Sequence, residues 1–127
     1  MKIVVVEDDK MLAEMYQYSL QNHGYTVVLA YDGPSALTVI ENELPHLILL
    51  DLMLPQMSGD QVLKHLRESV WGKDLKVIIT TNISESEAPE TLRELTFERY
   101  LVKANTPPSQ LVQIVKQTLT PETPVAS

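Results

Sequence analysis

Five short runs of apolar residues recur along the chain, and longer segments with a different hydrophobic pattern separate them. The runs cover residues 3–6, 26–30, 47–50, 77–80 and 100–102. Their hydrophobicity is continuous rather than alternating, which is typical of strands that are covered on both faces. We therefore predict five buried strands.

The segments between the runs carry apolar residues at the spacing of an amphipathic helix. The stripes expected to face the core contain Leu12, Met15, Tyr16 and Leu20; Ala36, Leu37 and Ile40; Val62, Leu63 and Leu66; and Leu111, Ile114, Val115 and Leu119. Segment 86–95 has only Ala88, Leu92 and Leu95 at this spacing, and a fourth helix is expected there. Strands that alternate with helices predict an α/β fold, in which right-handed crossovers place helices on both faces of a parallel sheet.

The composition limits the size and class of the protein. A chain of 127 residues with 44% hydrophobic content can form one core, so we predict one domain over 1–119. Residues 120–127 contain prolines and no apolar period, and we expect a flexible tail. The chain has no cysteine, which excludes disulfides and thiolate metal sites and is compatible with the cytoplasm.

Charge and hydropathy exclude two classes of partner. The net charge of -7 repels phosphate backbones, so we expect no nucleic acid to bind this chain. The first apolar run stops after four residues, which is too short for a signal peptide or a membrane span. A soluble protein without a membrane partner is expected.

Carboxylates directly follow two of the predicted strands. Glu7, Asp8 and Asp9 follow the first strand, and Asp51 follows the third. If these strands are neighbours, Glu7, Asp8 and Asp51 converge at the carboxyl edge of the sheet, and their repulsion favours a bound divalent cation such as Mg²⁺. The alternatives are that the first acids only stabilise the start of the next helix and that Asp51 only caps its loop.

A hydroxyl and an ammonium group follow two other predicted strands. Thr81 lies at the end of the fourth strand and Lys103 at the end of the fifth. With the acids they form a set suited to phosphoryl transfer, in which Asp51 is the nucleophile. Mg²⁺ and Lys103 would neutralise the phosphoryl oxygens, and Thr81 would donate a hydrogen bond to one of them. Each residue alone has a simpler explanation, a turn cap or a solvated lysine, but their combination favours the site.

Four phrases of the sequence resemble, in this order, the signature regions of response-regulator receiver domains. They are KIVVVEDDKMLAEMY, PHLILLDLMLPQMSGDQVLKHLR, KVIITTN and RYLVKANTPPSQLV, within residues 2–119. The resemblance implies a flavodoxin-like, doubly wound (βα)5 fold with a five-stranded parallel sheet in the order 2-1-3-4-5. It also implies roles for individual residues. Glu7 and Asp8 would be the acid pair that binds Mg²⁺, Asp51 the phosphoacceptor and a metal ligand, and Met53 a metal ligand through its backbone carbonyl. Thr81 and Tyr100 would be the switch residues, and Lys103 the phosphate-binding lysine.

The function implied by this resemblance is that of a phosphoacceptor switch in a two-component phosphorelay. A sensor histidine kinase or a phosphotransfer protein would phosphorylate Asp51 in the presence of Mg²⁺. Phosphorylation would change the surface of the fourth helix, fifth strand and fifth helix, and with it the binding of a downstream protein or output domain, or of a second copy. The chain would catalyse only its own phosphorylation and dephosphorylation, so it is not expected to be an enzyme. It either acts alone on partners or is part of a longer protein.

The resemblance also places Met53 and Ile83 beside the path of the water that hydrolyses the phosphorylated aspartate. Neither side chain can hydrogen-bond a water molecule, and both are bulky. We therefore expect a long-lived phosphorylated state.

Two positions depart from the family pattern. Asn82 stands where a small residue is usual, and we expect it to crowd the phosphoryl pocket or to form a hydrogen bond there. Ala104 replaces the proline that normally follows the lysine through a cis peptide bond. Since a cis bond before another residue is costly, loop 103–108 is expected to run differently.

Three alternative functions explain fewer of these features. An aspartyl-phosphate phosphohydrolase usually needs a second acid where this chain has Met53. A nucleotide- or flavin-binding protein needs a Gly- or Ser-rich turn after the first strand, and this turn is acidic. A receiver that serves only for docking would not need all the charged groups, which are present here.

Overall fold

The computed structural model describes residues 1–120, and its five strands form one parallel sheet in the order β2-β1-β3-β4-β5. The strands are β1 (Lys2–Val6), β2 (Thr26–Ala30), β3 (Leu47–Leu50), β4 (Lys76–Thr81) and β5 (Arg99–Val102). The α-helices are α1 (Lys10–Gln21), α2 (Gly33–Glu43), α3 (Gly59–Glu68) and α4 (Pro108–Leu119). The predicted doubly wound fold and strand order are confirmed. Of the predicted tail, residues 121–127 lie outside the described part.

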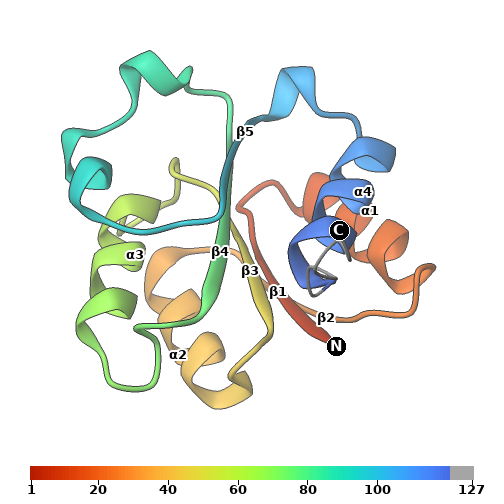
Figure 1. Ribbon diagram of the computed structural model, residues 1–127, viewed down its shortest axis with the longest axis horizontal. Coiled ribbons are helices and arrows are strands. Elements are labelled where there is room, and N and C mark those ends of the chain that lie inside the picture. Colours follow the sequence, from red (N-terminus) through yellow and green to blue (C-terminus); the bar gives the residue numbers. More distant parts are fainter. Residues whose placement is uncertain (121–127) are drawn as a thin grey trace, which may run out of the picture.

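The sheet separates two apolar layers. Helices α1 and α4 cover one face, and α2 and α3 cover the other (Figure 1). Strands β1 and β3 lie in the middle, and their apolar residues are buried on both faces. This double burial explains why their sequences read as unbroken apolar runs. No helix in the described range is long and apolar enough to span a membrane.

One residue of the predicted core stripes lies outside the core. Met15 is 48% exposed, and Met11 and Tyr18 on the same helix are exposed as well. Residues three and four positions apart share a face of a helix, so these three form one outer stripe of α1. Tyr16 and Leu20 occupy the inner face and are buried. The prediction for Met15 is therefore wrong, because the inner face needs fewer apolar residues than the sequence provides.

The helix predicted over 86–95 is also wrong. Two short 3₁₀ helices, η1 (Glu85–Glu87) and η2 (Glu90–Glu94), take its place. Ala88 separates them with an extended backbone, at ψ 150°. A residue that precedes proline disfavours the helical region, and Pro89 follows. The β4–β5 connection, residues 82–98, is thus built of turns rather than a regular helix.

A half-buried arginine fixes the far end of the β4–β5 connection. Arg67 of α3 donates hydrogen bonds from Nε and Nη2 to the carbonyl of Thr96, at 3.0 and 2.8 Å. Its Nη1 donates to the carbonyls of Gly72, Lys73 and Leu75. One guanidinium therefore ties α3, the loop before β4 and the chain before β5 together, because its five N–H groups form a rigid fork.

Candidate functional site

Four strands bring their carboxyl ends to one edge of the sheet. Val6 pairs with Leu50 and Leu50 with Ile79, so Glu7 and Asp51 extend from neighbouring strands. Thr81 pairs with Val102, the residue before Lys103. The predicted acids, hydroxyl and lysine thus meet at the edge where α/β proteins gather their functional groups.

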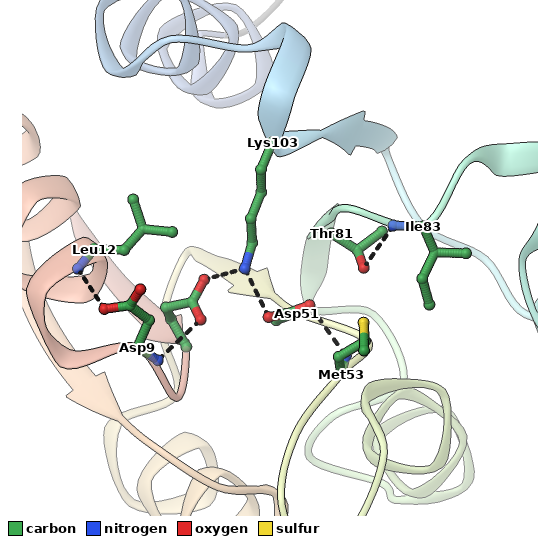
Figure 2. A network of polar contacts seen from close by, with 8 residues as sticks. Asp9, Leu12, Asp51, Met53, Thr81, Ile83 and Lys103 are labelled. Atoms are coloured by element: carbon green, nitrogen blue, oxygen red, sulfur yellow. Dashed lines mark hydrogen bonds and ion pairs between the residues drawn. The ribbon is translucent and has the colours of Figure 1, made fainter.

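One lysine contacts two buried carboxylates at this edge. Glu7 and Asp51 are 1% and 3% exposed. Lys103 Nζ lies 2.7 Å from Asp51 Oδ2 and also forms an ion pair with Glu7 Oε1 (Figure 2). Lys103 begins a short 3₁₀ helix, η3 (Lys103–Asn105), and no peptide bond within residues 1–120 is cis, as expected with alanine at 104. Two carboxylates with one ammonium leave an excess of negative charge.

Burial and these neighbouring charges together shift the pKa values of Glu7 and Lys103. Burial raises the pKa of Glu7, the charge of Asp51 adds to the effect, and Lys103 only partly opposes it. Burial lowers the pKa of Lys103, but its contacts with Asp51 and Glu7 outweigh burial and raise that pKa overall. Lys103 is therefore charged at neutral pH. Because the pKa of Glu7 is higher in the folded state, protonated Glu7 contributes to the stability of the fold. This contribution is lost as the pH rises through the pKa of Glu7 in the folded protein.

The predicted metal ligands fit a hard divalent cation. Carboxylate oxygens of Glu7, Asp8 and Asp51 lie within 4.8 Å of one another, and Asp8 is exposed at the entrance. Glu7 Oε1 is fully buried and, apart from the ion pair with Lys103, has no hydrogen-bond partner in the described chain. A set of three carboxylate oxygens with access to water is typical of Mg²⁺ sites. The third acid of the run, Asp9, instead caps α1, where its side chain accepts a hydrogen bond from the Leu12 backbone N–H.

Backbone contacts orient the Asp51 carboxylate. The Met53 N–H donates to Asp51 Oδ1 at 3.1 Å, while Lys103 holds Oδ2. Each oxygen therefore has its own donor. The role of the Met53 carbonyl as a metal ligand stays a prediction.

The loop after Asp51 folds back on itself, so that Gly59 contacts the beginning of the loop. The Gly59 N–H donates to the Leu52 carbonyl at 2.9 Å. A Cβ atom at Gly59 would lie 2.0 Å from the Asp51 carbonyl oxygen, which is closer than any side chain allows. Glycine is therefore required beside the acceptor, a constraint that the sequence pattern does not reveal.

Gly59→Ala is therefore expected to destabilise the protein by about 2 kcal/mol or more, because the backbone that carries Asp51 must move. Urea unfolding measures this loss. Gly24→Ala is the matched control: Gly24 has φ +91° but open space around it, so it should lose stability through backbone strain alone and keep normal phosphorylation. A Gly59→Ala variant as stable as the wild type would contradict the close approach.

A chain of hydrogen bonds leads from this edge to Tyr100. Thr81 is fully buried, and its Oγ1 accepts a hydrogen bond from the Ile83 N–H at 3.4 Å. The Ile83 carbonyl accepts a hydrogen bond from the Tyr100 hydroxyl at 2.7 Å. Burial, together with the charges of Glu85 and Asp51, raises the pKa of Tyr100, so its hydroxyl remains a donor. The two predicted switch residues are thus connected through Ile83.

The remaining predicted residues lie on two loops, with Met53 beside Asp51 and Ile83 beyond Thr81 (Figure 2). Met53 is 61% exposed beside the acceptor, and Ile83 packs partly against the layer of α2 and α3 (Figure 2). Asn82 is exposed, and within residues 1–120 its side chain makes no hydrogen bond. The expectation that it crowds the site stays a prediction.

Comparison with known proteins places the chain among signalling domains. Residues 3–116 match the family described as response regulator receiver domain. The transcriptional regulatory protein PhoP of Bacillus subtilis is 37% identical over 107 residues, which cover 84% of this chain and 43% of that protein. The regulator DltR of Streptococcus agalactiae is 40% identical over 103 residues, or 81% of this chain and 45% of that protein. The chain spans less than half the length of these relatives.

A solved structure agrees over nearly the whole chain. The CheY-like receiver domain protein of Methanospirillum hungatei JF-1 superimposes with a TM-score of 0.84 at 27% identity. The match covers 93% of this chain and 92% of that protein.

Proposed function

The chain belongs to the receiver domains of two-component response regulators, and from this premise we propose that it is a switch whose phosphoryl group is carried by Asp51. The main support is the contact of Lys103 Nζ with the buried Asp51 carboxylate at 2.7 Å, next to Glu7 and Asp8. A sensor histidine kinase or a phosphotransfer protein would be the donor. The domain would comprise residues 1–119 and work in the cytoplasm.

In the transfer step, one oxygen of Asp51 forms a bond to phosphorus, and the bond from phosphorus to the donor's imidazole nitrogen breaks. The leaving imidazole keeps the electron pair and takes up a proton. Whichever oxygen attacks, the other keeps a hydrogen-bond donor, Met53 N–H or Lys103 Nζ. Lys103 would then neutralise a phosphoryl oxygen, because a preorganised ammonium stabilises charge that develops in the transition state.

Glu7, Asp8, Asp51 and the Met53 backbone carbonyl would hold Mg²⁺. When bound, Mg²⁺ would supply positive charge to the phosphoryl oxygens. Within this chain the ion would also offset the repulsion among the three carboxylates. The chain would catalyse only its own phosphorylation and dephosphorylation.

Phosphorylation would be transmitted through Thr81. The Thr81 hydroxyl donates no hydrogen bond within the described residues, so it is free to bind a phosphoryl oxygen. Moving it would disturb the Ile83 N–H and, through the Ile83 carbonyl, the Tyr100 hydroxyl. The affected surface would consist of the β4–β5 connection, β5 and α4, where a downstream protein, an output domain or a second copy would bind.

Mass measurement of the intact protein tests the proposal. After exposure to acetyl phosphate with Mg²⁺, the addition of one phosphoryl group would support a phosphoacceptor switch. An unchanged mass under conditions that label another receiver domain would contradict it.

Asp8→Asn is expected to weaken Mg²⁺ binding and prevent phosphorylation while leaving the metal-free protein no less stable. Asp8 is exposed, and its removal lowers the repulsion among the acids. Thermal melts with Mg²⁺ and with EDTA measure both effects, because a ligand that binds only the folded state raises its melting temperature. Glu14→Gln, an exposed acid on α1, is the control and should show the wild-type shift. An equal shift in Asp8→Asn would refute the metal assignment.

A further inference from the structure

A pocket of about 450 Å³ lies beneath the β4–β5 connection, where the predicted helix is missing. Its apolar lining comes from Ala88, Leu92, Leu95, Phe97 and Tyr100. The rings of Phe97 and Tyr100 lie 6.5 Å apart and are tilted by 56°. A pocket of this size with aromatic walls is typical of sites that bind a ligand or a partner's side chain.

The pocket results from the break in the chain at Pro89. Leu92 is buried, but Ala88 after η1 and Leu95 after η2 have extended backbones. They therefore cannot form one continuous stripe that fills the space against the sheet. The apolar side chains line a hollow instead.

The segment that forms the pocket carries an excess of negative charge. Glu85 and Arg93 line the pocket, and Glu87, Glu90 and Glu94 are exposed on the same β4–β5 connection. We call these four acids the rim glutamates; Arg93 is the one basic residue among positions 85–98. None of the four glutamates forms an ion pair within residues 1–120. Unpaired charge of one sign around an apolar site favours a partner of the opposite sign.

Hydrogen bonds to neighbouring elements hold the chain around the pocket in place. Arg67 binds the carbonyl of Thr96, which lines the pocket. Glu98 accepts a hydrogen bond from the Val77 N–H at 3.0 Å, which fixes the chain at the start of β5. A preorganised pocket loses less entropy when it binds a partner.

We propose that this pocket receives an apolar side chain, leucine or an aromatic residue, from a lysine- or arginine-rich segment of a partner protein. The anchor would contact Leu92, Phe97 and Tyr100, and the flanking cations would meet the rim glutamates. Apolar anchors that fill a pocket supply most of the affinity at protein interfaces, and rim charges supply specificity. All lining residues belong to the β4–β5 connection and β5, so binding does not require phosphorylation.

Phosphorylation would adjust this affinity through Tyr100, and this step rests on the proposed function. The Tyr100 ring forms one wall of the pocket, and its hydroxyl is bound to the Ile83 carbonyl. Any shift of Thr81 and Ile83 therefore moves a wall of the pocket. The affinity of the segment should change when Asp51 is phosphorylated.

The test uses a labelled synthetic peptide with phenylalanine and leucine on one helical face and lysines on the other. In one matched peptide alanines replace the apolar residues, and in a second glutamates replace the lysines. Fluorescence anisotropy without phosphodonor should show saturable binding of the first peptide alone. Amide chemical shifts of the protein should change around Leu92, Phe97 and Tyr100.

Two protein variants and one control variant locate the site. Ala88→Phe fills the pocket and should weaken binding about tenfold or more, whereas Thr91→Ala, exposed on the same segment and outside the lining, should bind normally. Replacing Glu85, Glu87 and Glu90 by glutamine leaves the core intact and should lower both the affinity and its salt dependence. This triple variant keeps the test decisive if Ala88→Phe folds poorly.

Equal binding of all three peptides, shift changes at another surface, or wild-type affinity in the glutamine variant would overturn the proposal. Self-association of the chain through these residues would assign the pocket to a second copy and overturn it too. These binding measurements need no phosphodonor. They therefore test the pocket even if Asp51 is not phosphorylated, and the two proposals can fail independently.

Discussion

Asp51→Asn is expected to take up no phosphoryl group from acetyl phosphate or phosphoramidate in the presence of Mg²⁺, whereas the wild type takes up one. An amide nitrogen or oxygen cannot replace the carboxylate as nucleophile. Glu7 is the other buried acid in contact with Lys103, but it lacks the Met53 N–H that orients Asp51. Mass spectrometry of the intact protein and its peptides measures the loss.

The variant should remain folded, because Glu7 and Lys103 keep their ion pair when the Asp51 charge is removed. Asp74→Asn, an exposed acid before β4, serves as the control and should be labelled like the wild type. Undiminished labelling of Asp51→Asn would show that the acceptor is another residue.

The strands could be predicted from the sequence because parallel strands in a doubly wound fold are buried on both faces. Residues 47–50 and 3–6 are apolar throughout, and both lie in the middle of the sheet. The position of the functional groups could be predicted as well, because the carboxyl ends of parallel strands lie at one edge of the sheet. Glu7, Asp51, Thr81 and Lys103 therefore meet where the pattern indicated.

The β4–β5 connection could not be predicted in the same way. Ala88, Leu92 and Leu95 have helical spacing, but the extended backbone before Pro89 prevents a continuous helix. The hydrophobic periodicity favours a helix there, and the proline disfavours one. The effect of the proline is larger because few apolar contacts would stabilise a helix in this segment. The pocket that results depends on this local outcome and has no sequence pattern of its own.

Close contacts between individual atoms could not be predicted from the sequence either. The distance between a Cβ at Gly59 and the Asp51 carbonyl depends on how the loop folds back, not on the spacing of the two residues. The same holds for the ion pair between Lys103 and Glu7, which requires strands β1 and β5 to be placed in space. Residue type and strand position indicated which groups meet, but not which atoms touch.

The double variant Met53→Asn, Ile83→Glu is expected to lose its phosphoryl group about tenfold to a hundredfold faster than the wild type, because polar side chains can orient the attacking water. In hydrolysis a water oxygen bonds to phosphorus as the bond to the Asp51 oxygen breaks. Met53, 61% exposed beside Asp51, is free to shield the phosphorus without disturbing the core. Ile83 is partly packed against the layer of α2 and α3, so its replacement also perturbs that layer.

The single variants separate these two contributions. Met53→Asn should accelerate the loss of phosphate and leave stability unchanged, while Ile83→Glu should also lower the melting temperature, because it removes apolar packing beside the carbonyl that holds Tyr100. Val70 is an exposed apolar residue in the turn after α3, and Val70→Asn controls for the added polarity. Phosphate loss is followed at fixed Mg²⁺ after removal of the phosphodonor. If the double variant decays at the wild-type rate, the two side chains do not control access of water, and the lifetime is set by how tightly Lys103 and Thr81 hold the phosphoryl oxygens.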